Sequence, residues 1–272
     1  MVLTINLLAA VEAFARALAT RPTRVELAGG GEIEGLVAAV NCQGRLRTGD
    51  SRRAEAFVSD ADNPVRGLLM WGKGWSRHWG DTRRRFSVGP AATRVEYRGR
   101  AFAQVNTGAN RRLVDAVLEY AAQSEPGHVL DLYAGAGNLA LPLAQVAAKV
   151  EAVESNPAAI SAARGSAQKL KLDNLSFHRC RVETFLAEPN AADHTPADLV
   201  VVDPPRSGLG GAARQLARLR CPRLIYVSCD AATLARDMKT LAAEGYVLKH
   251  VLPIDMFPHS YHVEAVCVAE LT

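Results

Sequence analysis

The feature that most constrains this chain is a regular alternation of short apolar runs with helix-forming segments between residues 110 and 272. Helical periodicity fills the stretches that separate the runs. Alternation of this kind is typical of a parallel sheet with helices on both faces. We therefore expect an α/β domain over residues 106–272, with strand-forming runs at 128–133, 149–154, 175–180, 197–203, 223–228, 246–256 and 263–271.

The preceding part, residues 1–105, has a different pattern. It opens on an amphipathic helix in which Asn6, Glu12 and Arg16 interrupt an apolar run, so neither a signal peptide nor a membrane span is expected. Short β-type runs follow, separated by turn residues that include Gly49 and Asp50. We expect a smaller, mostly antiparallel α+β region with strand-like runs at 25–28, 31–40, 44–47, 86–89 and 93–105.

Basic residues are concentrated in the first part of the chain. Residues 1–120 hold 18 Lys and Arg against 12 Asp and Glu, although the whole chain carries only +4. The stretch 66–112 has 11 basic residues, with Trp71, Trp75, Trp79, Phe86, Tyr97 and Phe102 between them. Arginines that neutralise phosphates beside rings that stack on bases predict binding of single-stranded RNA. The alternative is a solvated hairpin with ordinary core aromatics.

The cysteines exclude some classes of site. Five are present, an odd number, and no two form a CxxC pair. This usage argues against a disulfide framework, a zinc site or an iron-sulfur cluster, and it favours the reducing cytoplasm.

A first group of candidate residues follows the strand at 128–132. In an open parallel sheet, ligands bind beyond the carboxyl ends of the strands. The segment from Asp131 to Asn138 contains Gly135 and Gly137, which allow a tight turn and close approach of a ligand. The third glycine of a dinucleotide-binding fingerprint is replaced by Ala140. The next strand ends at Glu154, whose carboxylate suits a ribose diol; the alternative is that Glu154 caps the following helix.

A second group follows later strands. Asp203 and Arg206 lie in an Asp-Pro-Pro-Arg segment, where prolines fix the backbone as it leaves the sheet. Cys229 comes between a strand and a helix, where oriented amides favour a thiolate and hence a nucleophile. Near the end, His259, His262 and Glu264 leave a metal site open as an alternative, although no metal is expected. The other cysteines are interpreted as structural.

These motifs, taken in order, resemble the RNA uracil-C5 methyltransferases, which make 5-methyluridine in ribosomal and transfer RNA. The resemblance covers roughly residues 100–272 and rests on AFAQVNTGANRRLV, DLYAGAGNLALPLA, VEAVE, VVDPPRSG, YVSCDAATLARD and DMFPHSYHVE. It implies a Rossmann-like class I methyltransferase domain that uses S-adenosyl-L-methionine.

The resemblance also implies roles for individual residues. Cys229 would be the nucleophile that adds to carbon 6 of uracil, and Glu264 the base that removes the proton from carbon 5. The expected cofactor-binding residues are Gln104, Asp131, Tyr133, Gly135, Gly137, Asn138, Glu154 and Asp203. The expected substrate-binding residues are Phe102, Asn106, Arg206 and His259.

The chain departs from the family pattern in three respects. On this resemblance we expect neither the N-terminal TRAM domain nor the four iron-sulfur cysteines found in many members, and Arg181 stands where the family has Asn. Three explanations of this shortened region stay open. The enzyme could act on a smaller RNA, it could rely on a protein partner to bind RNA, or it could be a truncated product with weak activity. Two other functions also stay open: methylation of an amino group, and RNA binding without catalysis.

Overall fold

The computed structural model describes residues 5–29, 32, 35–98, 104, 106–187, 196–260 and 262–272. The chain divides into two compact units, Met1–Phe86 with Tyr97–Arg100, and Ser87–Glu96 with Ala101–Thr272. Each unit is described separately.

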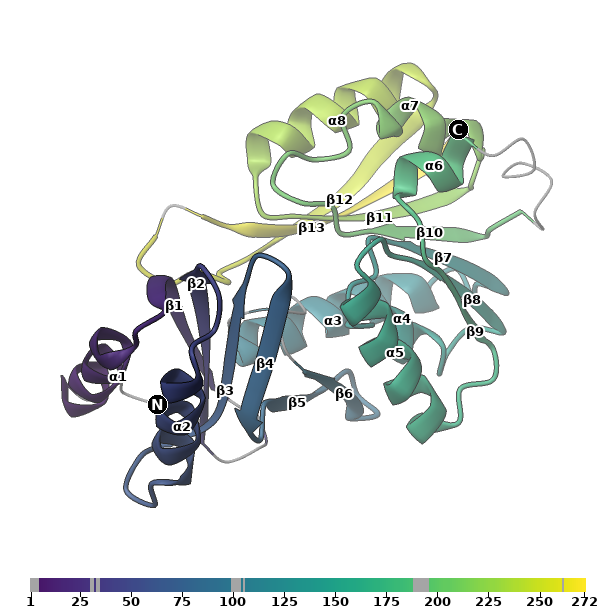
Figure 1. The fold of residues 1–272 in the computed structure, drawn as a ribbon. Helices are drawn as coiled ribbons and strands as arrows, with labels where there is room; N and C mark the ends of the chain where they lie inside the picture. The colour runs from purple at the N-terminus through teal and green to yellow at the C-terminus, as the bar shows by residue number, and fades with distance from the viewer. Residues whose placement is uncertain are drawn as a thin grey trace. The chain divides into compact units, whose positions relative to one another are not determined.

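The second unit is built on a seven-stranded sheet (Figure 1). Its strands lie in the order β12-β13-β11-β10-β7-β8-β9. All neighbouring pairs from β11 to β9 are parallel, whereas β13 is antiparallel to both β11 and β12. The strands are β7 (His128–Leu132), β8 (Lys149–Val153), β9 (Leu175–His178), β10 (Leu199–Val202), β11 (Arg223–Ser228), β12 (Tyr246–Ile254) and β13 (Glu264–Leu271).

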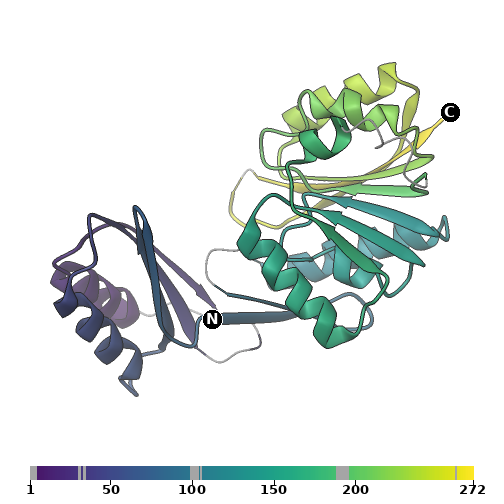
Figure 2. The same cartoon turned by 45° about the vertical axis from the view of Figure 1, so that its right-hand side comes forward.

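Helices cover both faces of this sheet, as Figure 2 shows. One face carries α3 (Thr107–Ala122), α4 (Ala140–Leu143) and α5 (Pro157–Leu170), and the other α6 (Val182–Ala187), α7 (Ala212–Arg218) and α8 (Ala231–Ala243). Side chains from α6, α7 and α8 pack with alternate residues of β7, β10 and β11 in one buried apolar cluster. The predicted α/β class is confirmed. The short helices α6 and α7 were not predicted.

The order of the strands determines where a ligand would bind. The chain runs outward from β7 through β8 to β9 and then returns to the other side of β7 as β10. The carboxyl ends of β7 and β10 are therefore adjacent, with Val202 paired to Leu132. This reversal is the topological switch point at which open α/β sheets bind ligands.

The first unit contains a four-stranded sheet, β1 (Arg21–Gly29), β2 (Leu36–Gln43), β3 (Val65–Gly72) and β4 (Trp75–Gly80), in that order. Its β2–β3 pair is parallel and the other two pairs are antiparallel. Helices α1 (Ile5–Ala17) and α2 (Thr48–Ser59) pack on the sheet, and α2 connects the parallel strands. Separately, β5 (Arg83–Val88) and β6 (Thr93–Arg98) form a two-stranded sheet.

Helix α2 corrects the sequence interpretation of Gly49 and Asp50 as turn residues and of 44–47 as a strand. Asp50 is fully buried in the first turn of α2. Its carboxylate accepts hydrogen bonds from the backbone N–H of Ala19 (2.9 Å) and from both the N–H (2.7 Å) and the hydroxyl (2.6 Å) of Thr20. Burial works to raise the pKa of Asp50, but these hydrogen bonds outweigh it and the pKa is lowered. Asp50 thus ties the end of α1 to the start of α2.

Several aromatic rings of the basic stretch are used within the fold. Trp75 and Trp79 pack against the core of the first unit, and the indole N–H of Trp75 donates to the carbonyl of Gly44 at 2.8 Å. Tyr97 is 5% exposed and lies edge-on to Phe86, with ring centroids 5.9 Å apart. These four rings therefore behave as core aromatics, which was the alternative interpretation. Phe102 lies outside the described residues.

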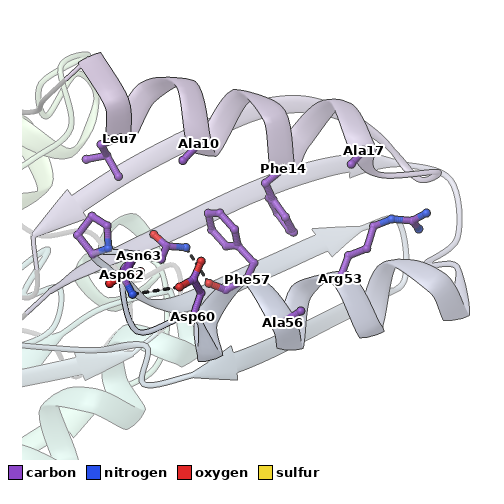
Figure 3. A pocket seen from close by; sticks show the side chains of 11 residues that line it. Leu7, Ala10, Phe14, Ala17, Arg53, Ala56, Phe57, Asp60, Asp62 and Asn63 are labelled. Atoms are coloured by element: carbon purple, nitrogen blue, oxygen red, sulfur yellow. Dashed lines mark hydrogen bonds between the residues drawn. The ribbon is translucent and has the colours of Figure 1, made fainter.

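A pocket of about 810 Å³ lies between α1 and α2 (Figure 3). Its lining is mostly apolar, with Phe14 and Phe57 stacked at 4.3 Å between ring centroids. None of the predicted site residues lines it. In the described part of the chain, no helix combines the length and apolar character needed to cross a membrane.

Candidate active site

The turn after β7 has the backbone geometry expected of a ligand-binding loop. Tyr133, Gly135 and Gly137 all have positive φ, at 64°, 56° and 91°. A Cβ at Gly137 would meet Leu141 Cγ at 2.8 Å, so a side chain there is excluded. A Cβ on Gly135, by contrast, would meet no atom within 4 Å. Gly135 therefore faces open space, and a ligand can approach its backbone closely.

Asp131 is the most unusual group at this end of the sheet. It is fully buried, and among the described residues no donor meets hydrogen-bond geometry with either carboxyl oxygen. Burial first, and then the nearby Asp203 and Glu154, raise the pKa of Asp131 well above its ordinary value, while the amide of Ala140 partly opposes them. A buried carboxyl of this kind is stabilised by a hydrogen-bond donor or a cation, which a ligand can supply.

Glu154 follows β8 and is half-buried. Its carboxylate accepts from the N–H of Gly135 at 3.0 Å and from the N–H of Asn156 at 2.6 Å. The N-cap of α5 is Asn156, whose side chain accepts from Ala158 N–H at 2.9 Å. Capping of the helix by Glu154 is therefore excluded. Glu154 instead closes the glycine turn and retains lone pairs for further hydrogen bonds.

The register of β11 and β13 brings Cys229 and Glu264 together. Ser228 pairs with Ala265, so the next positions along the two strands are Cys229 and Glu264. Asp203 follows β10, which is paired with β11, and its N–H donates to Leu132 O at 3.3 Å. Arg206 lies three residues further on. These side chains meet at the carboxyl edge of β10 and β11.

The two carboxyl groups here are held partly protonated at neutral pH. Glu264 is 2% exposed, and its burial raises the pKa to about 7, with Arg206 opposing the rise. Burial and then the charge of Glu264 raise the pKa of Asp203 to about 8. A carboxyl with a pKa near the working pH is suited to accept and release protons.

Cys229 differs from the sequence expectation in one respect. Burial, then Glu264 and Asp203, raise the pKa of its thiol, and Arg206 opposes them. The N-cap of α8 is Asp230, which accepts from Thr233 N–H at 2.9 Å, so Cys229 precedes the helix. Burial, together with the nearby carboxyl groups, thus outweighs any helix effect, and the thiolate depends on positive charge.

The loop between β12 and β13 holds the remaining candidates. His259 is exposed and has a φ of 66°, and His262 lies edge-on to Phe257, with ring centroids 6.0 Å apart. The metal alternative built on His259, His262 and Glu264 receives no support, because no group of three or more His, Cys, Asp or Glu within the described residues could hold a metal ion.

Other predicted residues have structural contacts of their own. Asn106 is the N-cap of α3 and accepts from Ala109 N–H at 3.1 Å. Asn138 exchanges two amide hydrogen bonds with Asn110, at 2.8 and 2.9 Å. Gln104 and Tyr133 are half-buried, and burial raises the pKa of Tyr133 to about 12. Arg181 pairs with Glu183 at 3.2 Å.

Two buried polar residues near the site were not predicted. Asn110 supports Asn138, and Asp237 on α8 accepts from the backbone after the Asp-Pro-Pro-Arg segment. The only sequence signal was a polar residue on the apolar face of each helix.

Electrostatic interactions connect the candidate residues in a row, which consists of Glu154, Asp131, Asp203, Glu264 and Cys229. Glu154 and Asp203 both act on Asp131, and Glu264 acts on Asp203. Cys229 is in turn affected by Glu264 and Asp203. Asp203 is therefore an electrostatic neighbour both of Asp131 beside the glycine turn and of Cys229.

This fold and site define a Rossmann-like methyltransferase architecture. Trm5b from Pyrococcus abyssi has the same fold, with a TM-score of 0.57 at 11% identity over 100% of this chain and 79% of that chain. Residues 82–270 match the profile of the tRNA (Uracil-5-)-methyltransferase family. The chain belongs to that family.

Relatives within the family extend beyond the matched region. The 23S rRNA (uracil(1939)-C(5))-methyltransferase RlmD of Pseudomonas fluorescens is 42% identical over 176 residues, which are 65% of this chain and 39% of the relative. That of Pectobacterium atrosepticum is 38% identical over 179 residues, again 65% and 39%. The match thus spans about two fifths of these relatives.

A solved structure agrees with these matches. The tRNA (uracil-54, C5)-methyltransferase of Pyrococcus abyssi, in complex with S-adenosyl-L-homocysteine, aligns with a TM-score of 0.68 and 25% identity. The alignment covers 88% of this chain and 56% of that chain.

Proposed function

We propose that this protein transfers a methyl group from S-adenosyl-L-methionine to carbon 5 of a uridine in RNA. The observation that carries the proposal is the placement of Cys229 and Glu264 on adjacent positions of paired strands. Asp203 lies close enough to be affected by Glu264 and to act on Cys229. Carbon 5 of uracil is too electron-poor to attack a methyl donor directly, so the reaction needs both a nucleophile and a base.

The residues around the glycine turn fit the cofactor. Asp131 is buried without a well-placed donor, Gly135 faces open space, and Glu154 can accept hydrogen bonds from a ribose diol. Gln104, Tyr133, Gly137, Asn138 and Asp203 complete the proposed cofactor-binding set. When bound, the cofactor supplies an electrophilic methyl group on a positively charged sulfur.

Cys229 acts first. Its thiolate adds to carbon 6 of uracil, a C–S bond forms, and the electron pair of the 5,6 double bond makes carbon 5 nucleophilic. Carbon 5 then forms a bond to the methyl carbon, and the sulfur–methyl bond would break with its electron pair left on sulfur as a neutral thioether. Arg206 supports this step because its positive charge favours the Cys229 thiolate.

Glu264 completes the reaction. Its carboxylate removes the proton from carbon 5, the 5,6 double bond forms again, and Cys229 leaves as thiolate. With a pKa of about 7, Glu264 is about half ionised at neutral pH and can both take up this proton and release it afterwards.

RNA is the proposed substrate, in keeping with the rRNA and tRNA specificities named for the relatives. We assign Phe102, Asn106, Arg206 and His259 to the substrate side. Residues 1–105 would bind RNA mainly through phosphate contacts of their arginines, because Trp75 and Trp79 serve the core. A protein partner is the alternative source of RNA affinity. Free cysteines and an RNA substrate favour the cytoplasm.

The test uses RNA that contains 5-fluorouridine. Fluorine cannot leave carbon 5 as a cation, so the adduct between Cys229 and carbon 6 persists after methyl transfer and is resolved on a denaturing gel. We expect the adduct with the natural chain and none with Cys229→Ala. The matched control is Cys180→Ala, which removes a partly buried cysteine that is not among the proposed site residues. This variant should form the adduct as the natural chain does.

A second variant tests the base. Glu264→Gln should methylate ordinary uridine RNA once and then remain attached to it, because the carbon-5 proton is not removed. Full turnover by Cys229→Ser would refute the proposed chemistry and favour amino-group methylation, which needs no thiolate. RNA binding without methyl transfer to any RNA would favour the non-catalytic alternative.

A further inference from the structure

Asp237 connects two segments that carry the proposed chemistry. It lies on α8, is 1% exposed, and accepts hydrogen bonds from the backbone N–H groups of Leu209 (2.6 Å) and Gly210 (3.3 Å). The hydroxyl of Tyr226 on β11 donates to the same carboxylate at 2.7 Å. One buried side chain therefore joins β11, α8 and the loop that follows β10.

Arg236 adds a second link between Asp237 and the loop that follows β10. Its guanidinium donates to Asp237 Oδ1 from Nε (3.0 Å) and from Nη2 (2.9 Å). The same Nη2 donates to the carbonyl of Ser207 at 2.7 Å. The backbone of residues 207–210 is thus held through both its carbonyl and its N–H groups.

The loop is shaped to fit against Asp237. Gly208 has a φ of 70°, and its N–H closes a turn onto the carbonyl of Pro205 at 2.7 Å. A Cβ at Gly208 would lie 2.3 Å from Asp237 Oδ2, so any side chain there would displace the loop or the carboxylate. The turn that begins at Pro205 contains Arg206.

Arg206 is the positive charge that acts on both Cys229 and Glu264. Its side chain is exposed, and its backbone lies within the turn that the Gly208 N–H closes onto Pro205. We propose that Asp237 is a positioning residue: it fixes residues 205–210 against α8 and so holds Arg206 beside Cys229 and Glu264. The proposal rests on the proposed function for the roles of Cys229 and Glu264.

The chemistry of the contact favours positioning over packing alone. A buried carboxylate is costly unless fully hydrogen-bonded, and an apolar side chain would fill the same space at lower cost. Charge-assisted hydrogen bonds from backbone N–H groups are directional, so they define the path of the loop more closely than apolar contact does. The Asp237 carboxylate defines the path of the loop because it accepts hydrogen bonds from two loop N–H groups and from the Arg236 guanidinium, which also donates to the loop carbonyl of Ser207.

The test is the pH profile of Cys229 alkylation by iodoacetamide, with Cys229 identified by peptide mass spectrometry. Only the thiolate reacts, so the profile reports the pKa of the thiol. In Asp237→Asn the amide nitrogen cannot accept, and the loop loses part of its attachment. We expect the profile to move upward by about one pH unit, with alkylation about tenfold slower below the pKa. Arg206→Gln should produce the same shift.

The double variant Arg206→Gln/Asp237→Asn shows whether Asp237 affects the Cys229 thiol through Arg206 or independently of it. If Asp237 acts through Arg206, the double variant should shift no further than Arg206→Gln alone. An additional shift of similar size in the double variant would overturn the proposal. The control is Glu244→Gln, which makes the same charge change at the exposed end of α8 and should leave the profile unchanged.

If Asp237→Asn does not fold, Arg236→Gln tests the same proposal. Arg236 is half exposed, and its loss releases the carbonyl of Ser207 while the carboxylate stays. We expect a smaller shift in the same direction, and an unchanged profile in folded protein would overturn the proposal. Alkylation needs neither RNA nor cofactor. A shifted profile in a protein that forms no adduct with 5-fluorouridine RNA would therefore retain the positioning role and reject the proposed function.

Discussion

Replacing Glu264 by glutamine should stabilise the protein at neutral pH while abolishing turnover. Glu264 is 2% exposed, and its pKa is raised from 4.5 to about 7, chiefly by burial. A group whose pKa is higher in the folded state than in the unfolded state favours folding most at low pH. Its contribution is fully present below pH 4.5 and is lost as the pH rises to 7.

The size of the effect follows from the shift in pKa. A difference of about 2.5 units corresponds to about 3 kcal/mol in the free energy of unfolding, at about 1.4 kcal/mol per unit. Glutamine has a similar shape and no charge, so it avoids this loss. We therefore expect Glu264→Gln to match the natural chain at pH 4 and to exceed its stability by about 3 kcal/mol at pH 8.

Urea unfolding at a series of pH values measures this difference. Far-UV circular dichroism, which includes the signal of the second unit, should be compared with tryptophan emission, because Trp71, Trp75 and Trp79 all belong to the first unit and their emission reports on that unit. Glu244→Gln provides the control for loss of an exposed charge. A stability difference that does not vary with pH, or a Glu264→Gln variant less stable at pH 8, would refute the electrostatic reasoning.

Two further predictions concern other carboxyl groups. Binding of S-adenosyl-L-methionine near pH 7.5 should release protons, because a positive sulfur lowers the pKa values of Asp203 and Glu264 from about 8 and about 7. Calorimetry in buffers of different ionisation enthalpy measures this, and proton uptake would contradict it. In the first unit, Asp50→Asn should cost about 2 kcal/mol at pH 7, since buried hydrogen bonds to a charged group are lost. The lowered pKa of Asp50 places this stabilisation above pH 3.8, to be lost on acidification; tryptophan emission in urea tests both points.

The sequence was most informative where a side chain follows directly from a buried strand. Asp131, Glu154 and Asp203 each come at or just after the end of an apolar run, and a parallel sheet brings such ends to one edge. The strands themselves were predictable because continuous apolar runs can be buried only inside a sheet covered on both faces. Helices α6 and α7 were missed because each is seven residues or shorter and has too few turns to show a period.

Contacts between distant segments could not be predicted. Asn110 and Asp237 each contact a partner 28 residues away, and although each is a polar residue on the apolar face of its helix, nothing local identifies that partner. Asp50 was taken for a turn residue because aspartate favours turns, whereas its carboxylate is bound by residues 30 positions earlier. The sequence suggested that helix amides favour the Cys229 thiolate, but burial and then Glu264 and Asp203, which are distant in sequence, raise the pKa of this thiol.

The row of carboxyl groups also bears on which ligand the glycine turn can accept. Burial is the main cause of the raised pKa values of Asp131 and Asp203, and repulsion adds to it, from Asp203 and Glu154 at Asp131 and from Glu264 at Asp203. A dinucleotide would bring a doubly negative pyrophosphate to this edge and increase the repulsion. A cofactor with a positive sulfur reduces it and, through the same charges, favours the Cys229 thiolate. The missing third glycine only weakened the dinucleotide interpretation, whereas the electrostatics of the row oppose it directly.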